Sequence, residues 1–141
     1  MIVVDTNVVS AVMRDSAEAR VIAWMNALPA TSLWISAISI FEIRFGLSRL
    51  PAGKRRQTLE NAFERSVAED FEGRVLNFDD GAANAAGAIA AAREAVGKPV
   101  EVRDIQIAGI AKHHGATVAT RNTRHFEGLG ITLIDPWTAS R

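Results

Sequence analysis

Short apolar runs alternate with longer helical patterns along the whole chain. The runs have the length and composition of buried strands and lie at 2–4, 33–35, 75–78, 117–120 and 131–134. Strands that alternate with helices predict a parallel sheet covered on both faces. We therefore expect an α/β fold, with a central parallel β-sheet of four to five short strands sandwiched by α-helices.

Capping and helix-breaking residues predict where the helices begin and end. The expected N-terminal caps are, in chain order, Asn7, Ser16 and either Asp79 or Asp80. An amphipathic helix is expected over 54–71, because Leu59, Phe63 and Val67 recur every four residues. The last helix is expected from about Val102 to His114, with Gly115 as its stop.

Composition narrows the class of protein. The 141 residues are 48% hydrophobic, which suits one domain over 1–141 with a substantial core. Sixteen basic residues balance sixteen acidic ones, so local patches must attract any nucleic acid. The absence of cysteine excludes disulfides and thiolate metal sites. With no secretory signal pattern and no apolar run of roughly 20 residues, we expect a soluble cytoplasmic protein without membrane contact.

Asp5 directly follows the first apolar run, in a predicted strand-to-helix turn. Ligands of open parallel sheets bind in the crevice outside the carboxyl ends of the strands. An aspartate in such a turn is elsewhere often only a helix cap. Taken alone, Asp5 fits the capping interpretation better. Whether it also belongs to a binding site depends on the other residues of the chain.

Two further acids occupy positions that predict low exposure. Glu42 lies in a helix with apolar residues on nearly every side, which predicts that the helix is buried and that Glu42 needs a partner. That partner could be Arg44 or another arginine, although Arg44 points elsewhere on the helix. Asp104 heads a core-facing stripe with Ile107 and Ala108, yet the helix dipole alone could favour an aspartate in a first turn.

Together, Asp5, Glu42 and Asp104 indicate a common site. Each lies at a strand end or helix start, and a parallel α/β unit directs such groups to one edge of the sheet. Like charges in a poorly solvated cleft call for a raised pKa or a bound cation. Oxygen ligands favour Mg²⁺ or Mn²⁺, and Mg²⁺ commonly shares its ligands with substrate phosphates. The pattern therefore points to phosphoryl chemistry, provided that the acids converge and are not each paired with an arginine.

Other chemistries find less support. The sequence has no Walker loop, no GxGxxG after a strand and no GxSxG elbow. His113, His114 and His125 match no usual zinc spacing, and histidines at a helix end are better explained by its dipole. A basic group around Arg44, Arg49, Lys54, Arg55 and Arg56 is interpreted mainly as a solvated face. Arg121, Arg124 and His125 follow a strand directly, so we expect them to position phosphate in the crevice of Asp5.

The segments MIVVDTNVVS, ISAISIFEIRFG, VRDIQIAGIAKHHGATVATRNTRHF and LIDPW resemble a PIN-domain ribonuclease toxin of the VapC/FitB type. The resemblance covers nearly the whole chain. It implies a metal-dependent endoribonuclease of a type II toxin–antitoxin system, inactive while a cognate VapB-like, DNA-binding antitoxin is bound. It also implies a homodimer, a larger assembly with the antitoxin, and an RNA substrate.

The resemblance carries the family's catalytic and metal-binding acids onto Asp5, Glu42 and Asp104. A fourth position, acidic in some relatives, is Asn122, which leaves one or two metal ions open. Positions that support the site through hydroxyl groups are Thr6, Ser36 and Thr120. The hypothesis for the mechanism is that Asp5 and Asp104 hold Mg²⁺ or Mn²⁺ directly, while Glu42 binds or orients a metal-bound water that attacks phosphorus.

Other parts of the chain carry the remaining expectations. Arg121 or Arg124 stabilises the charge on the RNA phosphate. The aromatic residues Trp24, Phe41, Phe45 and Phe63 either form a groove for an antitoxin helix or belong to the core.

Two rival functions remain open. One is a non-catalytic RNA-binding or regulatory PIN module, with a metal site weakened by Asn122. The other is an aspartyl phosphotransferase similar to haloacid dehalogenases, which needs a second aspartate where this chain has Asn7.

Overall fold

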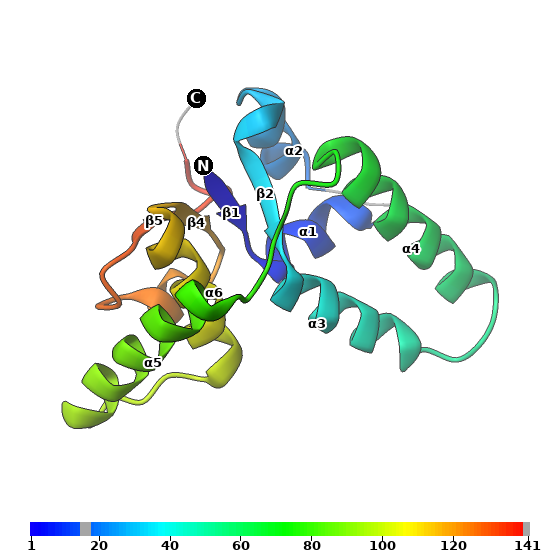
Figure 1. Cartoon of the computed structure of the whole chain (residues 1–141). Coiled ribbons are helices and arrows are strands. Elements are labelled where there is room, and N and C mark those ends of the chain that lie inside the picture. The colour runs from blue at the N-terminus through cyan, green and yellow to red at the C-terminus, as the bar shows by residue number, and fades with distance from the viewer. Residues whose placement is uncertain (15–17, 140–141) are drawn as a thin grey trace.

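A parallel five-stranded sheet forms the centre of the molecule (Figure 1). The computed structural model describes residues 1–14 and 18–139. The strands follow the spatial order β3-β2-β1-β4-β5. Their bounds are β1 Ile2–Val4, β2 Leu33–Ser36, β3 Val75–Leu76, β4 Thr117–Ala119 and β5 Thr132–Ile134. Every pairing in the sheet is parallel, which confirms the predicted α/β sandwich and places β1 at the centre.

Helices cover both faces of this sheet. Their bounds are α1 Thr6–Met13, α2 Ala19–Asn26, α3 Ala37–Ser48, α4 Lys54–Arg65, α5 Asp80–Ala95 and α6 Val102–His114. Adjacent residues of β1 serve opposite faces, as strand geometry requires. Val4 packs with the buried residues of α1, α2 and α3, whereas Val3 packs with those of α6. Within the described residues, no helix combines the length and apolarity needed to cross a membrane.

The observed N-terminal caps differ in part from those expected from the sequence. Helix α1 begins at Thr6, so Asp5 is its N-cap and the prediction of Asn7 is wrong. Ser36 caps α3, and of the two expected residues Asp79 caps α5. The predicted cap Ser16 lies outside the described residues.

Helix α3 is not buried all round, contrary to the prediction. Ile43 and Leu47 face the core, whereas the rings of Phe41 and Phe45 are 58% and 47% exposed and stack 6.2 Å apart. The helix packs on α1, β2, α4 and α6, and these elements leave part of its apolar surface in solvent. Of the four aromatic residues considered for a groove, Trp24 and Phe63 belong to the core, and Phe41 and Phe45 are exposed.

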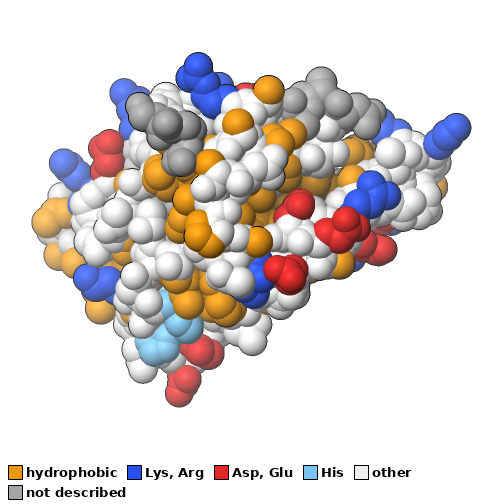
Figure 2. All heavy atoms as spheres, turned by 90° about the horizontal axis from the view of Figure 1, so that it is seen from above, with side chains coloured by type: hydrophobic (Ala, Val, Ile, Leu, Met, Phe, Trp, Pro, Cys, Tyr) orange, Lys and Arg blue, Asp and Glu red, His pale blue; other side chains and the backbone are white. Residues whose placement is uncertain are grey.

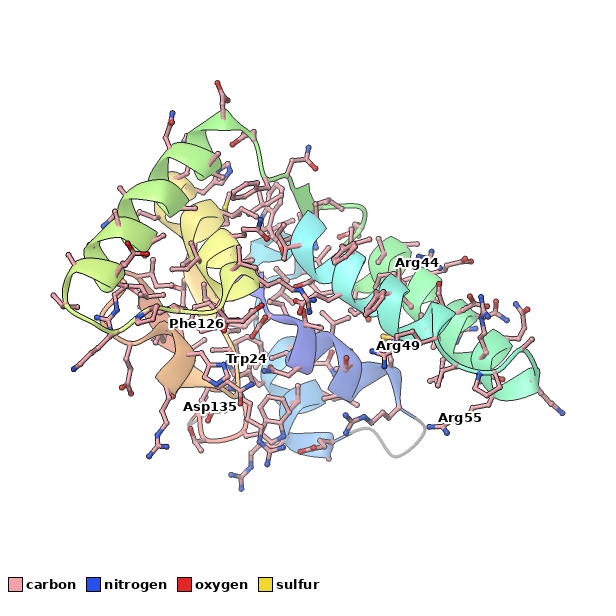
Figure 3. The ribbon with its side chains drawn as sticks, turned by 90° about the horizontal axis from the view of Figure 1, so that it is seen from below. Trp24, Arg44, Arg49, Arg55, Phe126 and Asp135 are labelled. Carbon is pink, nitrogen blue, oxygen red and sulfur yellow. The ribbon has the colours of Figure 1, made fainter. Side chains whose placement is uncertain are left out.

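The charged hairpin of α3 and α4 extends away from the sheet (Figure 1). Helix α4 ends at Arg65, and a π-helical turn over Ser66–Asp70 replaces the rest of the predicted helix. Figure 3 shows Arg44, Arg49 and Arg55 along this hairpin, whereas Trp24 lies among the packed elements nearer the centre. This arrangement fits the interpretation of the first basic group as a mainly solvated face.

Helices α5 and α6 form an antiparallel pair on the other face of the sheet. Gly109 of α6 lies against Ala82 and Ala86 of α5, so closely that a Cβ at Gly109 would be 2.6 Å from the carbonyl oxygen of Ala82. The alanine-rich sequence of α5 thus serves the packing of the two helices. Its small side chains let the start of α5 lie beside the end of α6.

Candidate active site

Three candidate acids reach the carboxyl edge of the sheet from different elements. Asp5 directly follows β1, Glu42 lies in α3 after β2, and Asp104 lies in the first turn of α6. Parallel strands end at the same edge, which is the reason residues so distant in sequence share a region. Exposed fractions are small: 6% for Asp5, and 22% and 19% for the side chains of Glu42 and Asp104.

Hydrogen bonds hold Asp5 in one orientation. Its Oδ1 accepts from the Thr6 backbone N–H at 2.8 Å, and its Oδ2 accepts from the Thr120 hydroxyl at 2.8 Å. The Asn7 amide also donates to Oδ2, at 3.4 Å. Asp5 is therefore both a helix cap and a buried carboxylate at the sheet edge, so the two interpretations of this residue are compatible.

The pKa values show that the acids influence one another. Burial raises the pKa of Asp5, against the hydrogen bonds from Thr120 and Thr6, and the charge of Glu42 raises it further. Burial also raises the pKa of Asp104 to about 6, and the charge of Asp5 is the next largest cause. Two carboxylates with raised pKa values in one pocket are costly to ionise, and a cation there would lower that cost.

Glu42 is held by a hydroxyl and a guanidinium. Its Oε1 lies 2.8 Å from the Thr6 hydroxyl, and its Oε2 lies 3.3 Å from Nη1 of Arg103. The Thr6 hydroxyl is also 2.9 Å from Oγ of Ser39. Because that hydroxyl has one proton, we assign it to the carboxylate, with Ser39 donating to Thr6. Arg103 is the arginine partner that the sequence left unidentified.

Asp104 has a histidine as its neighbour, not an arginine. Its Oδ2 lies 3.4 Å from Nδ1 of His125, whose side chain is 57% exposed. Among the described residues, an arginine ion pair is found for Glu42 but for neither Asp5 nor Asp104. An arginine partner for each acid would have argued against a common site. Only Glu42 has one among the described residues.

The donor chemistry of the pocket suits a hard divalent cation. The three acids offer carboxylate oxygens, which Mg²⁺ and Mn²⁺ prefer. Their oxygens do not all lie within 4.8 Å of one another, however. A bound cation would therefore either draw the side chains together or share them with water ligands, as Mg²⁺ commonly does.

The supporting residues divide into direct and indirect contacts. Thr6 and Thr120 touch the acids, as described above, whereas Ser36 reaches Glu42 only through Ser39 and Thr6. Asn122 donates its backbone N–H to the Thr120 hydroxyl at 3.0 Å. Sequence reasoning did not assign Asn7, Ser39 or Arg103 to the site. Their only sequence signal is proximity, since each lies one to three residues from a predicted acid.

The basic residues beside the pocket also differ. Arg121 stacks on the Trp137 ring at 4.8 Å and lies 3.8 Å from Glu18, so its guanidinium is already engaged. Arg124 instead lines a cleft of about 300 Å³ together with Asp104 and His125. The rest of that cleft is lined by Arg93, Lys98, Pro99, Val100, Glu101 and Glu127. A larger cleft of about 380 Å³ lies between α1 and α4, and none of the three acids lines it.

Comparison with known proteins identifies the family. The family model for the PIN domain matches residues 2–130. The chain is 42% identical to VapC ribonuclease Y4jK of Sinorhizobium fredii, over 97% of this chain and 98% of that protein. It is 36% identical to toxin FitB of Neisseria gonorrhoeae, over 97% and 99% of the two chains. A solved structure of FitAB bound to an IR36 DNA fragment superposes with a TM-score of 0.90 at 35% identity, covering 100% of this chain and 99% of the other. The chain therefore belongs to the PIN-domain family and is similar throughout its length to VapC- and FitB-type toxins.

Proposed function

We propose that this chain is a divalent-metal-dependent endoribonuclease that acts as the toxin of a toxin–antitoxin pair. The observation that carries the proposal is that Asp5, Glu42 and Asp104 lie at one edge of the sheet, where burial and neighbouring carboxylates raise the pKa of Asp5 and of Asp104. The names of the relatives supply the reaction class, because one of them is a ribonuclease. Such clustered carboxylates in a half-buried pocket are typical of metal-assisted phosphoryl chemistry.

Asp5 and Asp104 are the proposed ligands of Mg²⁺ or Mn²⁺, because they have the raised pKa values and no arginine partner. When bound, the cation lowers the pKa of water and offsets charge on the scissile phosphate. Glu42 orients the attacking water, and Thr6 and Arg103 hold the Glu42 carboxylate in place. The water oxygen bonds to phosphorus while the bond from phosphorus to the leaving ribose oxygen breaks; the water gives up a proton to solvent, and the leaving oxygen takes one up.

RNA contacts are proposed for the cleft beside Asp104. Arg93, Lys98 and Arg124 line it and supply positive charge for phosphate groups. Arg124 is therefore the stronger candidate of the two predicted phosphate ligands. Arg121 keeps that proposed role only where RNA displaces its guanidinium from Glu18.

The partner is proposed to be a DNA-binding antitoxin of the VapB or FitA kind. FitB is named as a toxin, and the FitAB structure contains DNA. The exposed rings of Phe41 and Phe45 offer this chain an apolar contact for an antitoxin helix or for a second copy in a homodimer. We also propose that the protein acts in the cytoplasm, because an RNA substrate is available there. Cell fractionation would test this. The prediction of a single domain over residues 1–141 also stays a proposal.

The rival function is RNA binding without cleavage. Asn122 favours this rival, because an amide brings no negative charge to the fourth family position. The two functions differ in their dependence on metal. A nuclease needs millimolar-range Mg²⁺ or Mn²⁺ and stops in chelator, whereas a binding module holds RNA intact under both conditions.

The test uses purified protein without antitoxin and a mixture of total RNA, with RNA binding measured beside cleavage. Asp104→Asn should lower cleavage at least about 100-fold, because losing several kcal/mol of cation-dependent stabilisation has that effect on a rate. RNA binding should persist. The matched control is Asp80→Asn, an exposed aspartate outside the acidic pocket. If Asp104→Asn protein cuts RNA at the wild-type rate, or wild-type protein cuts equally well in chelator, the proposal is wrong.

A further inference from the structure

Three metal-ligating side chains meet at the opposite end of α6 from Asp104. Asp79, His113 and His114 offer a carboxylate oxygen and two imidazole nitrogens, all within 4.8 Å of one another. All three residues are exposed, and Figure 2 shows histidine side chains gathered beside acidic ones at the surface. We propose that this triad is a second metal site, which binds a divalent transition ion such as Zn²⁺.

The packing of α5 on α6 assembles the triad. Asp79 is the N-cap of α5, and the two histidines are the last residues of α6. Because the helices are antiparallel, the first turn of one lies beside the last turn of the other. The close approach at Gly109 holds the two helices together near this end. The residues are far apart in sequence, so the spacing of the histidines alone does not reveal a third ligand.

Gly81 makes room for one of the ligands. The imidazole ring of His113 lies directly over Gly81, and a Cβ at that position would overlap three atoms of the ring. The rings of His113 and His114 meet edge to face, with centroids 4.9 Å apart. Consecutive helical residues usually point in different directions, about 100° apart. Here both imidazoles nevertheless reach the carboxylate of Asp79.

The charge state of Asp79 suits a cation. Its Oδ1 accepts from the Ala82 backbone N–H at 3.0 Å. That hydrogen bond, together with the nearby imidazoles, keeps the pKa of Asp79 below its ordinary value. Asp79 is thus a carboxylate at neutral pH. Among the described contacts, no other residue donates a hydrogen bond to its Oδ2, so this oxygen is available to a metal ion.

The donor set selects a class of ion different from that of the acidic pocket. Two imidazoles and one carboxylate suit Zn²⁺ and its neighbours, and three protein ligands leave one position open for water. Mg²⁺ instead prefers oxygen ligands. The site lies about 14 Å along α6 from Asp104, so an ion there is separate from one held by the acids. It would join the start of α5 to the end of α6, and its expected effect is on stability.

The experiment measures Zn²⁺ binding by calorimetry on the full chain, stripped of metal and then kept in excess Mg²⁺ to occupy the acidic pocket. Wild-type protein should bind one Zn²⁺ per chain and unfold at a higher temperature with Zn²⁺ than without it. The double variant His113→Ala/His114→Ala should lose that binding, and Asp79→Asn should weaken it at least about 10-fold. His125→Ala is the matched control, because it removes the remaining histidine and should keep the binding.

Gly81→Ala supplies a variant that leaves all three ligands in the chain. Its added methyl group displaces the His113 ring and should weaken Zn²⁺ binding. Histidine NMR signals give an independent readout, since Zn²⁺ should shift those of His113 and His114 in excess Mg²⁺. The proposal is overturned if wild-type protein binds no Zn²⁺ in excess Mg²⁺, or if the double variant, folded by circular dichroism, binds it as well as wild type does. Neither outcome bears on the ribonuclease proposal, which concerns other residues.

Discussion

Asp5 and Asp79 have the same local role and opposite surroundings. Each is the N-cap of a helix, and each accepts a hydrogen bond from a backbone N–H in that helix. Asp5 is nearly buried, at 6% exposure, and its pKa is raised. Asp79 is exposed, and its pKa is lowered. A local motif is therefore not enough to predict how a carboxylate behaves.

The difference comes from what surrounds each cap. Asp5 lies where the central strand meets α1, and the elements that bury it also bring Glu42 and Asp104 close. Asp79 lies at the edge of a helix pair, where water and two imidazoles stabilise its charge. Burial makes the charge of Asp5 costly and thus makes a cation valuable there. At Asp79 the carboxylate needs no such compensation, and metal binding depends on the added histidines.

The largest expected difference is in RNA cleavage. Asp5→Asn keeps the size of the side chain but removes the charge that the proposed cation requires, so cleavage should fall at least about 100-fold. The comparison is Asp80→Asn, in which an exposed aspartate also accepts a hydrogen bond from the following backbone N–H. Its cleavage rate should stay within about 2-fold of wild type. Equal rates for Asp5→Asn and Asp80→Asn would remove the functional distinction between buried and exposed aspartates.

The next effect is on the pH dependence of stability. The pKa of Asp104 is about 6 in the folded protein, against an ordinary value of 3.8, so the folded state binds this proton more tightly than the unfolded chain does. Stability of the metal-free protein should therefore fall as pH rises from about 4 to about 6, and then level off. Asp104→Asn removes this penalty and should be more stable than wild type by about 2 kcal/mol near neutral pH.

Urea unfolding in chelator, measured at several pH values, checks this prediction. The stability difference between Asp104→Asn and wild type should shrink as pH falls and disappear below the ordinary pKa of 3.8, where Asp104 is protonated in both states. Added Mg²⁺ should stabilise wild-type protein near neutral pH and leave Asp104→Asn nearly unchanged, because binding to the folded state alone raises stability. An Asp104→Asn variant less stable than wild type near neutral pH would contradict the assigned cost of this charge.

Sequence reasoning predicted the sheet and the position of the three acids at its edge, because the signals for both are local or familiar. The strands are short β-branched runs, and the acids lie beside them in motifs that resemble a known family. Exposure was harder to predict. Helix α3 was expected to be buried because it is apolar all round, but burial also requires something to cover each face. On the outer face, Phe41 and Phe45 stay 58% and 47% exposed, although the guanidinium groups of Arg103 and Arg49 lie over their rings.

Contacts between distant segments account for the other differences. Arg103 reaches Glu42 across the gap between α6 and α3, and no spacing in the sequence indicates that pair. The same holds for the triad at the end of α6. His113 and His114 were attributed to the helix dipole because the third ligand, Asp79, belongs to another helix. Topology, not sequence spacing, brings these groups together.

The smallest expected effect separates the capping role of Asp79 from its charge. Asp79→Ala removes the acceptor for the Ala82 N–H, so the unfolding temperature of metal-free protein should fall by about 2–4 °C. Asp79→Asn keeps an acceptor and should lower it by less. Because the pKa of Asp79 is lowered by folding, the stabilisation due to its charge is present above pH 3.8 and is lost as pH falls through the folded-state pKa. Asp79→Asn should therefore be less stable than wild type near neutral pH, and Asp104→Asn should be more stable. Both differences should shrink in acid. Thermal unfolding of both variants and of wild type across this pH range measures these differences. If both variants are more stable than wild type near neutral pH, or both are less stable, burial does not separate the two aspartates.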